Sequence, residues 1–115
     1  MSEVKMESGA LREITSADFI REVMASKEPA VVEFWTPWSR ACQILDAVVQ
    51  KLATEYAGIT RVVRVNADEC LDLGLVYDIQ SVPTLLCFVE GNPRWQIVGI
   101  ATLDAIQSKL KPLFE

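Results

Sequence analysis

The chemistry open to this chain of 115 residues is set by three cysteines and by the complete absence of histidine. Without imidazole the chain has no Ser-His or Cys-His nucleophile pair, no histidine general base and no zinc site that needs a histidine ligand. Cys42, Cys70 and Cys87 are widely and unequally spaced, so they predict neither a disulfide framework nor a metal motif. We therefore expect three reduced thiols, no metal and no cofactor.

Cys42 is placed by its neighbours near the start of a helix. The apolar segment 30–35 predicts a strand covered on both faces, Pro37 ends it, and apolar residues then recur at helical spacing from Ala41 to Gly58. Ligands and reactive groups gather at the carboxyl ends of parallel strands, so the loop between strand and helix is the expected site. Ser39, at the start of that helix, is of the residue type that caps helix N-termini.

The remaining elements complete an α/β pattern. Strands are predicted over 11–14, 61–65, 84–89 and 94–98, and helices over 16–26, within 66–77 with Asp68 as its cap, and from the cap Thr102 to about 113. A four-residue turn, 90–93, joins the last two strands. The order, a parallel βαβαβ half followed by an antiparallel ββα half, predicts a mixed central sheet with helices on both faces. One domain is expected over 11–115, after a flexible leader at 1–10.

Charge and hydropathy exclude several classes of partner. Eleven Lys and Arg against sixteen Asp and Glu give a net charge of −5, which opposes binding to nucleic acid or to anionic membranes. The longest stretch without a formal charge, 79–89, is far shorter than the roughly 18 to 20 residues of a membrane span. Charged residues among the first ten interrupt any export signal, so we expect a soluble, cytoplasmic protein.

Motifs from 11 to about 113 resemble the thioredoxin family, in the family's own order: Phe34-Trp35, Asn66-Ala67-Asp68, Tyr77-Asp78-Ile79, Val82-Pro83-Thr84 and Gly99. The family carries Trp-Cys-x-x-Cys in the strand-to-helix loop, where this chain has Trp38-Ser39-Arg40-Ala41-Cys42. The resemblance implies the thioredoxin fold and reduction of disulfides in client proteins, with electrons from a thioredoxin reductase. It places the family's nucleophilic cysteine at Ser39 and its resolving cysteine at Cys42.

Serine in place of the nucleophile changes the expected activity. A thiol at a helix N-terminus ionises readily, whereas a serine hydroxyl stays protonated there and cannot form a disulfide with Cys42. We therefore expect Ser39 to be an ordinary N-cap and dithiol turnover to be lost or severely impaired. Cys42 is either an inert buried thiol or a weakly reactive one that forms slow mixed disulfides. Glutaredoxin-like monothiol proteins keep the first cysteine, so glutathione chemistry through Cys42 is not expected.

The resemblance assigns further roles near the loop. Glu33 matches a buried aspartate and would relay a proton to or from Cys42, unless its longer side chain reaches solvent. Arg64 matches a lysine near that acid, or is a simple charge on the strand surface. Pro83 matches a cis-proline that faces the loop and presents backbone groups to an extended substrate.

We expect an apolar docking surface around the loop, formed by Trp38, Val82 and Ile100. The other residues expected to bind substrate are Arg40, Ala41 and Thr84. Trp35 is expected to pack against the loop. Cys87 lies in an apolar strand and is expected in the core, whereas Cys70, among acidic residues, is expected to be more exposed, which leaves a redox-sensing role open.

Two functions of different classes follow from these residues. The first is a thioredoxin-type disulfide oxidoreductase whose nucleophile is replaced by serine, through natural loss or deliberate substitution; both origins remain open. The second is a redox-inactive module that binds extended peptides or a protein partner between the Trp38 loop and Pro83, with a supporting subunit of another enzyme as a weaker variant. A monomer is expected in either case.

Overall fold

Five strands form one mixed sheet in the computed structural model, which describes residues 11–115. The strands are β1 (Arg12–Ile14), β2 (Ala30–Trp35), β3 (Arg61–Asn66), β4 (Thr84–Val89) and β5 (Asn92–Val98), in the spatial order β1-β3-β2-β4-β5. β3 runs parallel to β1 and β2, whereas β4 is antiparallel to both β2 and β5. This is the predicted mixed sheet. The leader expected at residues 1–10 lies outside the described residues.

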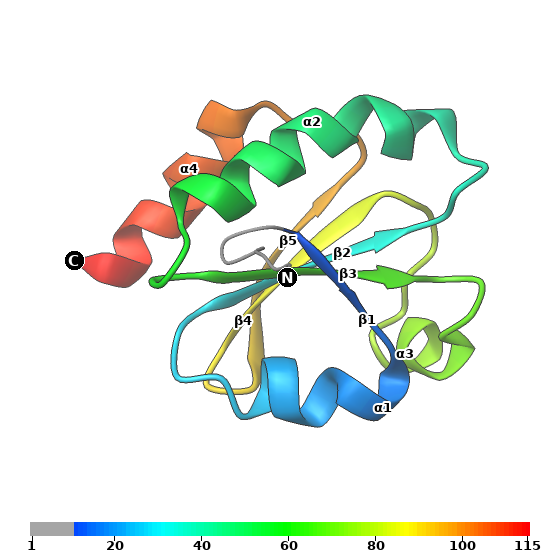
Figure 1. Ribbon diagram of the computed structural model, residues 1–115, viewed down its shortest axis with the longest axis horizontal. Helices are drawn as coiled ribbons and strands as arrows, with labels where there is room; N and C mark the ends of the chain where they lie inside the picture. Colours follow the sequence, from blue (N-terminus) through cyan, green and yellow to red (C-terminus); the bar gives the residue numbers. More distant parts are fainter. Residues whose placement is uncertain (1–10) are drawn as a thin grey trace, which may run out of the picture.

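Helices cover both faces of the sheet (Figure 1). Their bounds are α1 (Ser16–Phe19), which continues as the π-helical turn η2 (Ile20–Met24), α2 (Arg40–Glu55), α3 (Leu71–Val76), α4 (Leu103–Leu110) and the closing 3-10 turn η3 (Lys111–Phe114). α2 and α4 lie on one face, α1 and α3 on the other. Within residues 11–115, no helix has the length and apolar character needed to cross a bilayer.

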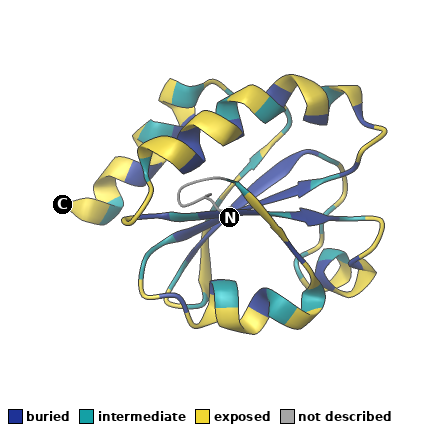
Figure 2. Cartoon of the chain, viewed as in Figure 1, coloured by how far each residue is buried: buried dark blue, intermediate teal, exposed yellow. Residues whose placement is uncertain are grey.

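The central strands are buried on both faces, and the helices keep an exposed outer side (Figure 2). Successive side chains of a strand point to opposite faces, so β2 contributes to two separate clusters. Val32 and Phe34 pack with Phe19 on the α1 side, whereas Val31 packs with Leu45 on the α2 side. The same alternation places Glu33 on the α2 side of the sheet, beneath the start of that helix.

The hairpin between β4 and β5 is tighter than predicted. Val89 pairs with Asn92, so the connection is two residues, Glu90 and Gly91, instead of the predicted 90–93. Both have positive φ, 52° and 80°, as a primed hairpin turn requires. Pro93 can lie inside β5 because β5 is an edge strand and the register shifts beside it.

The segment after β3 also differs from the prediction. Asp68 does not cap α3; the helix begins at Leu71 with Cys70 at the N-cap position. Asp68 belongs to a turn in which its backbone N–H donates to Asn66 Oδ1 at 2.9 Å, and the Cys70 N–H donates to the Asn66 carbonyl oxygen at 2.9 Å. This turn leaves Cys70 only 4% exposed, in one cluster with Leu73, so the expected exposure of Cys70 was wrong.

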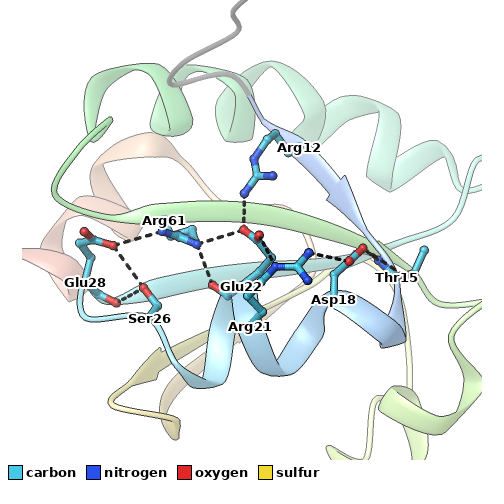
Figure 3. A network of polar contacts seen from close by, with 8 residues as sticks. All are labelled: Arg12, Thr15, Asp18, Arg21, Glu22, Ser26, Glu28 and Arg61. Atoms are coloured by element: carbon cyan, nitrogen blue, oxygen red, sulfur yellow. Dashed lines mark hydrogen bonds and ion pairs between the residues drawn. The ribbon is translucent and has the colours of Figure 1, made fainter.

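An ion-pair network joins the starts of β1 and β3 to η2 (Figure 3). Glu22 pairs with Arg12 and with Arg61, the latter at 3.0 Å, and Arg61 also lies 3.7 Å from Glu28. Glu22 is only 13% exposed, but Arg12, Arg21 and Arg61 are 35% to 70% exposed, so solvent screens the pairs and their contribution to stability is modest. The network lies at the amino ends of the parallel strands, opposite the predicted site.

Candidate active site

Several loops meet at the carboxyl ends of β2 and β3, where the sequence predicts a site. The Ala67 N–H donates to the Trp35 carbonyl oxygen at 2.9 Å, which joins the two strand ends. The Gly99 N–H donates to the Pro83 carbonyl oxygen at 2.9 Å, and the Val82–Pro83 bond is cis, as the resemblance implied. Phe34 on β2 pairs with Thr84 on β4, so the loop from 36 to 39 lies at the same end of the sheet as Pro83 and Gly99.

Ser39 is the N-cap of α2. Its Oγ accepts a hydrogen bond from the Cys42 backbone N–H at 3.2 Å, and its carbonyl oxygen accepts one from the Gln43 N–H at 3.2 Å. The residue is extended, with φ −80° and ψ 121°, and it is buried. This confirms the predicted N-cap and shows that the hydroxyl oxygen at the nucleophile position is held by the helix backbone.

Cys42 lies one turn into α2 and is only 2% exposed. Its side chain nevertheless forms part of the wall of a pocket of about 230 Å³, shared with Trp35, Gln43, Asp46 and Arg64. Cys42 forms no disulfide within residues 11–115.

Glu33 is completely buried on β2, and Arg64 is its register partner on β3. The Arg64 guanidinium lies 3.3 Å from Glu33 Oε1 and 3.3 Å from Asp46 Oδ1 on α2, with its centre 4.0 Å above the Trp35 ring. Two alternatives from the sequence are thereby excluded: Glu33 does not reach solvent, and Arg64 is not a simple charge on the strand surface.

Burial raises the pKa of Glu33 from its ordinary value of 4.5 to about 7. Arg64 opposes this shift because its positive charge favours the carboxylate, whereas the negative charge of Asp46 adds to it. Among residues 11–115, no group donates a hydrogen bond of good geometry to either Glu33 oxygen. Glu33 is therefore poised to take up or release a proton near neutral pH, on the same side of the sheet as Cys42.

The residues expected in the docking surface differ in their exposure. Trp38 is 70% exposed and its indole N–H donates to Asp68 Oδ2 at 2.7 Å, which fixes the ring over the turn after β3. Ile100 and Arg40 are exposed, and Val82 and Ala41 are half-buried. Thr84 differs from the expectation, because its side chain is buried and its hydroxyl donates to the Ser81 carbonyl oxygen at 2.8 Å. The Thr84 side chain is therefore not available to a substrate, and only the backbone of this residue lies beside Pro83.

Two features of the site were not predicted. Asp46 is four residues after Cys42, so helical spacing alone would have placed both on one face of α2. A groove of about 470 Å³ extends from Trp38 and Val82 along α3 to Leu71 and Leu75. Binding between the Trp38 loop and Pro83 was predicted, but the weak helical pattern of segment 66–77 gave no indication that the groove continues along α3.

The other two cysteines lie away from this site. Cys87 belongs to the cluster beneath α2 and α4, where burial raises the pKa of its thiol to about 12. Cys70 belongs to the cluster on the opposite face of the sheet. Within the described part of the chain, no group of three or more Cys, Asp or Glu side chains is arranged to hold a metal ion.

The sheet order, the cis-proline and the helix that follows the strand of the buried acid are those of the thioredoxin fold. The Thioredoxin family model matches residues 10–112. The chain is similar to thioredoxin 1 of Nostoc sp., at 34% identity over 102 residues, which is 89% of this chain and 95% of the relative. The chain belongs to the thioredoxin family, and both the predicted family and the predicted fold are confirmed.

Two further relatives support the same family assignment. Thioredoxin 1 of Synechococcus elongatus is 38% identical over 97 residues, covering 84% of this chain and 91% of the relative. A chloroplastic M-type thioredoxin of Triticum aestivum is 36% identical over 77 residues, covering 67% of this chain and 44% of that longer protein. These relationships support an oxidoreductase-type function.

Proposed function

We propose that this chain is a protein-disulfide oxidoreductase of the thioredoxin type in which dithiol turnover stops at Ser39. One observation carries the proposal: Ser39 Oγ occupies the N-cap of α2, hydrogen-bonded to the Cys42 N–H, at the position of the family's attacking sulfur. The buried Cys42 one turn into α2, the buried Glu33 on β2 and the cis bond before Pro83 support the proposal. Under this proposal the site lacks one atom, the sulfur of the first cysteine.

The missing atom determines which step fails. In dithiol exchange, the first thiolate attacks a client disulfide and releases one client thiolate, leaving a mixed disulfide. The second thiol, here Cys42, gives up its proton to a base and attacks that mixed disulfide. The client leaves as a dithiol, reduced by two electrons, while the enzyme's two cysteines are oxidised to a disulfide. With Ser39 the first attack has no thiolate, and Cys42 has no sulfur partner within the motif.

Ser39→Cys tests the proposal directly. Insulin reduction driven by dithiothreitol should be close to background for the native sequence and at least about a hundredfold faster for Ser39→Cys, since the nucleophile is restored. The double variant Ser39→Cys, Cys42→Ser is the matched control, because it restores the attacking thiol but not the second one. A folded Ser39→Cys protein without turnover would refute the proposal.

A redox-inactive binding module is the second candidate. It is favoured by the exposed Trp38 beside the groove along α3, which offers a docking surface that needs no thiol. Under this hypothesis Ser39→Cys leaves client binding unchanged and gives no insulin reduction. The assay above therefore separates the two functions.

Partners and cellular location belong to the same proposal. The clients are disulfide-containing proteins, and the Ser39→Cys form would be re-reduced by a thioredoxin reductase. Three free, buried thiols support a reducing compartment, and we propose the cytoplasm. We propose a monomer, which sedimentation of the purified protein would test. Cell fractionation that places the protein in an oxidising compartment would contradict the assignment.

A further inference from the structure

Within residues 11–115, Met24 carries the one sulfur atom whose side chain is exposed. The side chain is 37% exposed at the end of η2, whereas the three cysteines, Cys42, Cys70 and Cys87, are only 2%, 4% and 0% exposed. The other two methionines of the chain lie outside the described residues. A small oxidant in solution therefore meets the Met24 thioether without any opening of the fold, whereas the thiols are almost fully covered.

The Met24 thioether is held in one orientation. The Tyr77 hydroxyl donates a hydrogen bond to Met24 Sδ at 3.7 Å. The Tyr77 ring is itself fixed, because it packs edge-on against Phe88 with the centroids 5.1 Å apart and lies 5.7 Å from Phe19. The methyl end of Met24 lies at the β4–β5 turn, where a Cβ added at Gly91 would be 3.7 Å from Met24 Cε. The sulfur is therefore held between the end of α3 and this turn.

This arrangement makes the two lone pairs of the sulfur unequal. Oxidation of one lone pair or of the other gives different epimers of methionine sulfoxide, because the oxidised sulfur is chiral. The lone pair that accepts the Tyr77 hydroxyl proton is occupied, so an oxidant has to approach the second one. The exposed part of the side chain allows that approach.

We infer that Met24 is a modification site at which a small hydroperoxide forms predominantly one epimer of methionine sulfoxide. The free lone pair of Sδ attacks one oxygen of hydrogen peroxide, the S–O bond forms and the O–O bond breaks. The proton on the transferred oxygen passes to the departing hydroxide, so water leaves. The sulfur is oxidised by two electrons and the peroxide is reduced by two. No thiol takes part, so the inference is independent of the proposed function.

The test treats the native protein with hydrogen peroxide at about pH 5.5, where thiols are protonated and react slowly. After removal of the peroxide, trypsin releases residues 22–27, a fragment in which Met24 is the only sulfur-containing residue. Mass spectrometry measures its oxidation, and the two epimer-specific methionine sulfoxide reductases measure the amount of each epimer. One epimer should be in at least about fivefold excess in the folded protein. Protein oxidised in urea should give nearly equal amounts.

Tyr77→Phe tests the cause of the selectivity, because it removes the hydroxyl and keeps the ring. The excess of one epimer should fall below about twofold, and the oxidation of Met24 should become about twofold faster, since a lone pair is released. Tyr56→Phe is the matched control: Tyr56 is also half-buried, but it lies at the end of α2 and packs against Phe114. This variant should keep the native ratio. Circular dichroism confirms that each variant is folded.

Three results would overturn the inference. The first is equal amounts of the two epimers in the folded native protein. The second is an unchanged ratio in Tyr77→Phe, and the third is oxidation of any cysteine-containing fragment ahead of the fragment 22–27. Insulin reduction by Ser39→Cys has no bearing on these results, so failure of the proposed function is measured separately.

Discussion

The buried carboxyl of Glu33 should make the stability of this protein depend on pH in an unusual direction. Its pKa is about 7 in the folded protein and 4.5 in the unfolded chain. Between these values the folded state holds a proton that the unfolded state has released, so the free energy of unfolding falls as pH rises from about 4.5 to about 7. The shift corresponds to about 3 kcal/mol, at 1.36 kcal/mol per pKa unit.

Glu33→Gln isolates this effect, because glutamine has nearly the same shape and does not titrate. The ion pair with Arg64 exists only when Glu33 is ionised, so its effect is already part of the pKa of about 7, and the change of shape and hydrogen bonding adds an offset that does not depend on pH. The pH dependence of the difference is therefore the quantity to measure. Relative to the native protein, Glu33→Gln should gain about 3 kcal/mol between pH 4 and pH 8.

Urea unfolding followed by tryptophan fluorescence at several pH values measures this difference, and Glu90→Gln, an exposed carboxylate outside the site, is the control. A difference that stays constant with pH, or one that favours the native protein as pH rises, would refute the assigned pKa shift. Two further variants test the causes of the Glu33 pKa shift. Arg64→Met should move the fall in stability to higher pH, and Asp46→Asn should move it to lower pH.

Other expectations concern the cap, the hairpin and the thiols. Ser39→Ala should lower stability by about 1 kcal/mol in thermal or urea unfolding, because the Cys42 N–H loses its side-chain acceptor. Gly91→Ala should cost about 1 to 2 kcal/mol, since φ is +80° and the added Cβ would lie 3.1 Å from the Met24 carbonyl oxygen; equal stability would contradict the turn geometry. In the native protein all three thiols are buried and should react with a disulfide reagent at least about a hundredfold more slowly than in urea. Rapid labelling of one cysteine would show that it is accessible.

The elements with strong apolar patterning were predictable from the sequence. The strand at 30–35 and the helix from about 40 are defined by local periodicity, and the structure keeps them almost unchanged. The Ser39 cap followed from residue type, since a serine at a helix start has a backbone N–H within reach. These are local properties, and local sequence determines them.

The sequence-based predictions failed where contacts between distant parts of the chain determine the position of a residue. The position of Cys70 depends on a turn organised by the Asn66 side chain and on the cluster beneath α3, neither of which has a periodic pattern. The Arg64–Asp46 pair joins a strand to a helix on another part of the chain, so no spacing reveals it. The β4–β5 turn was too long in the prediction because Pro93 was assigned to the loop instead of to an edge strand.

Glu33 bears on the choice between the two proposed functions. A module that only binds partners gains nothing from a buried carboxyl that lowers stability by about 3 kcal/mol at neutral pH. Proton exchange with a thiol, by contrast, is favoured by a group whose pKa lies near 7, as that of Glu33 does. In the Ser39→Cys background, Glu33→Gln should therefore lower insulin turnover. Unchanged turnover would show that Glu33 has no part in proton transfer.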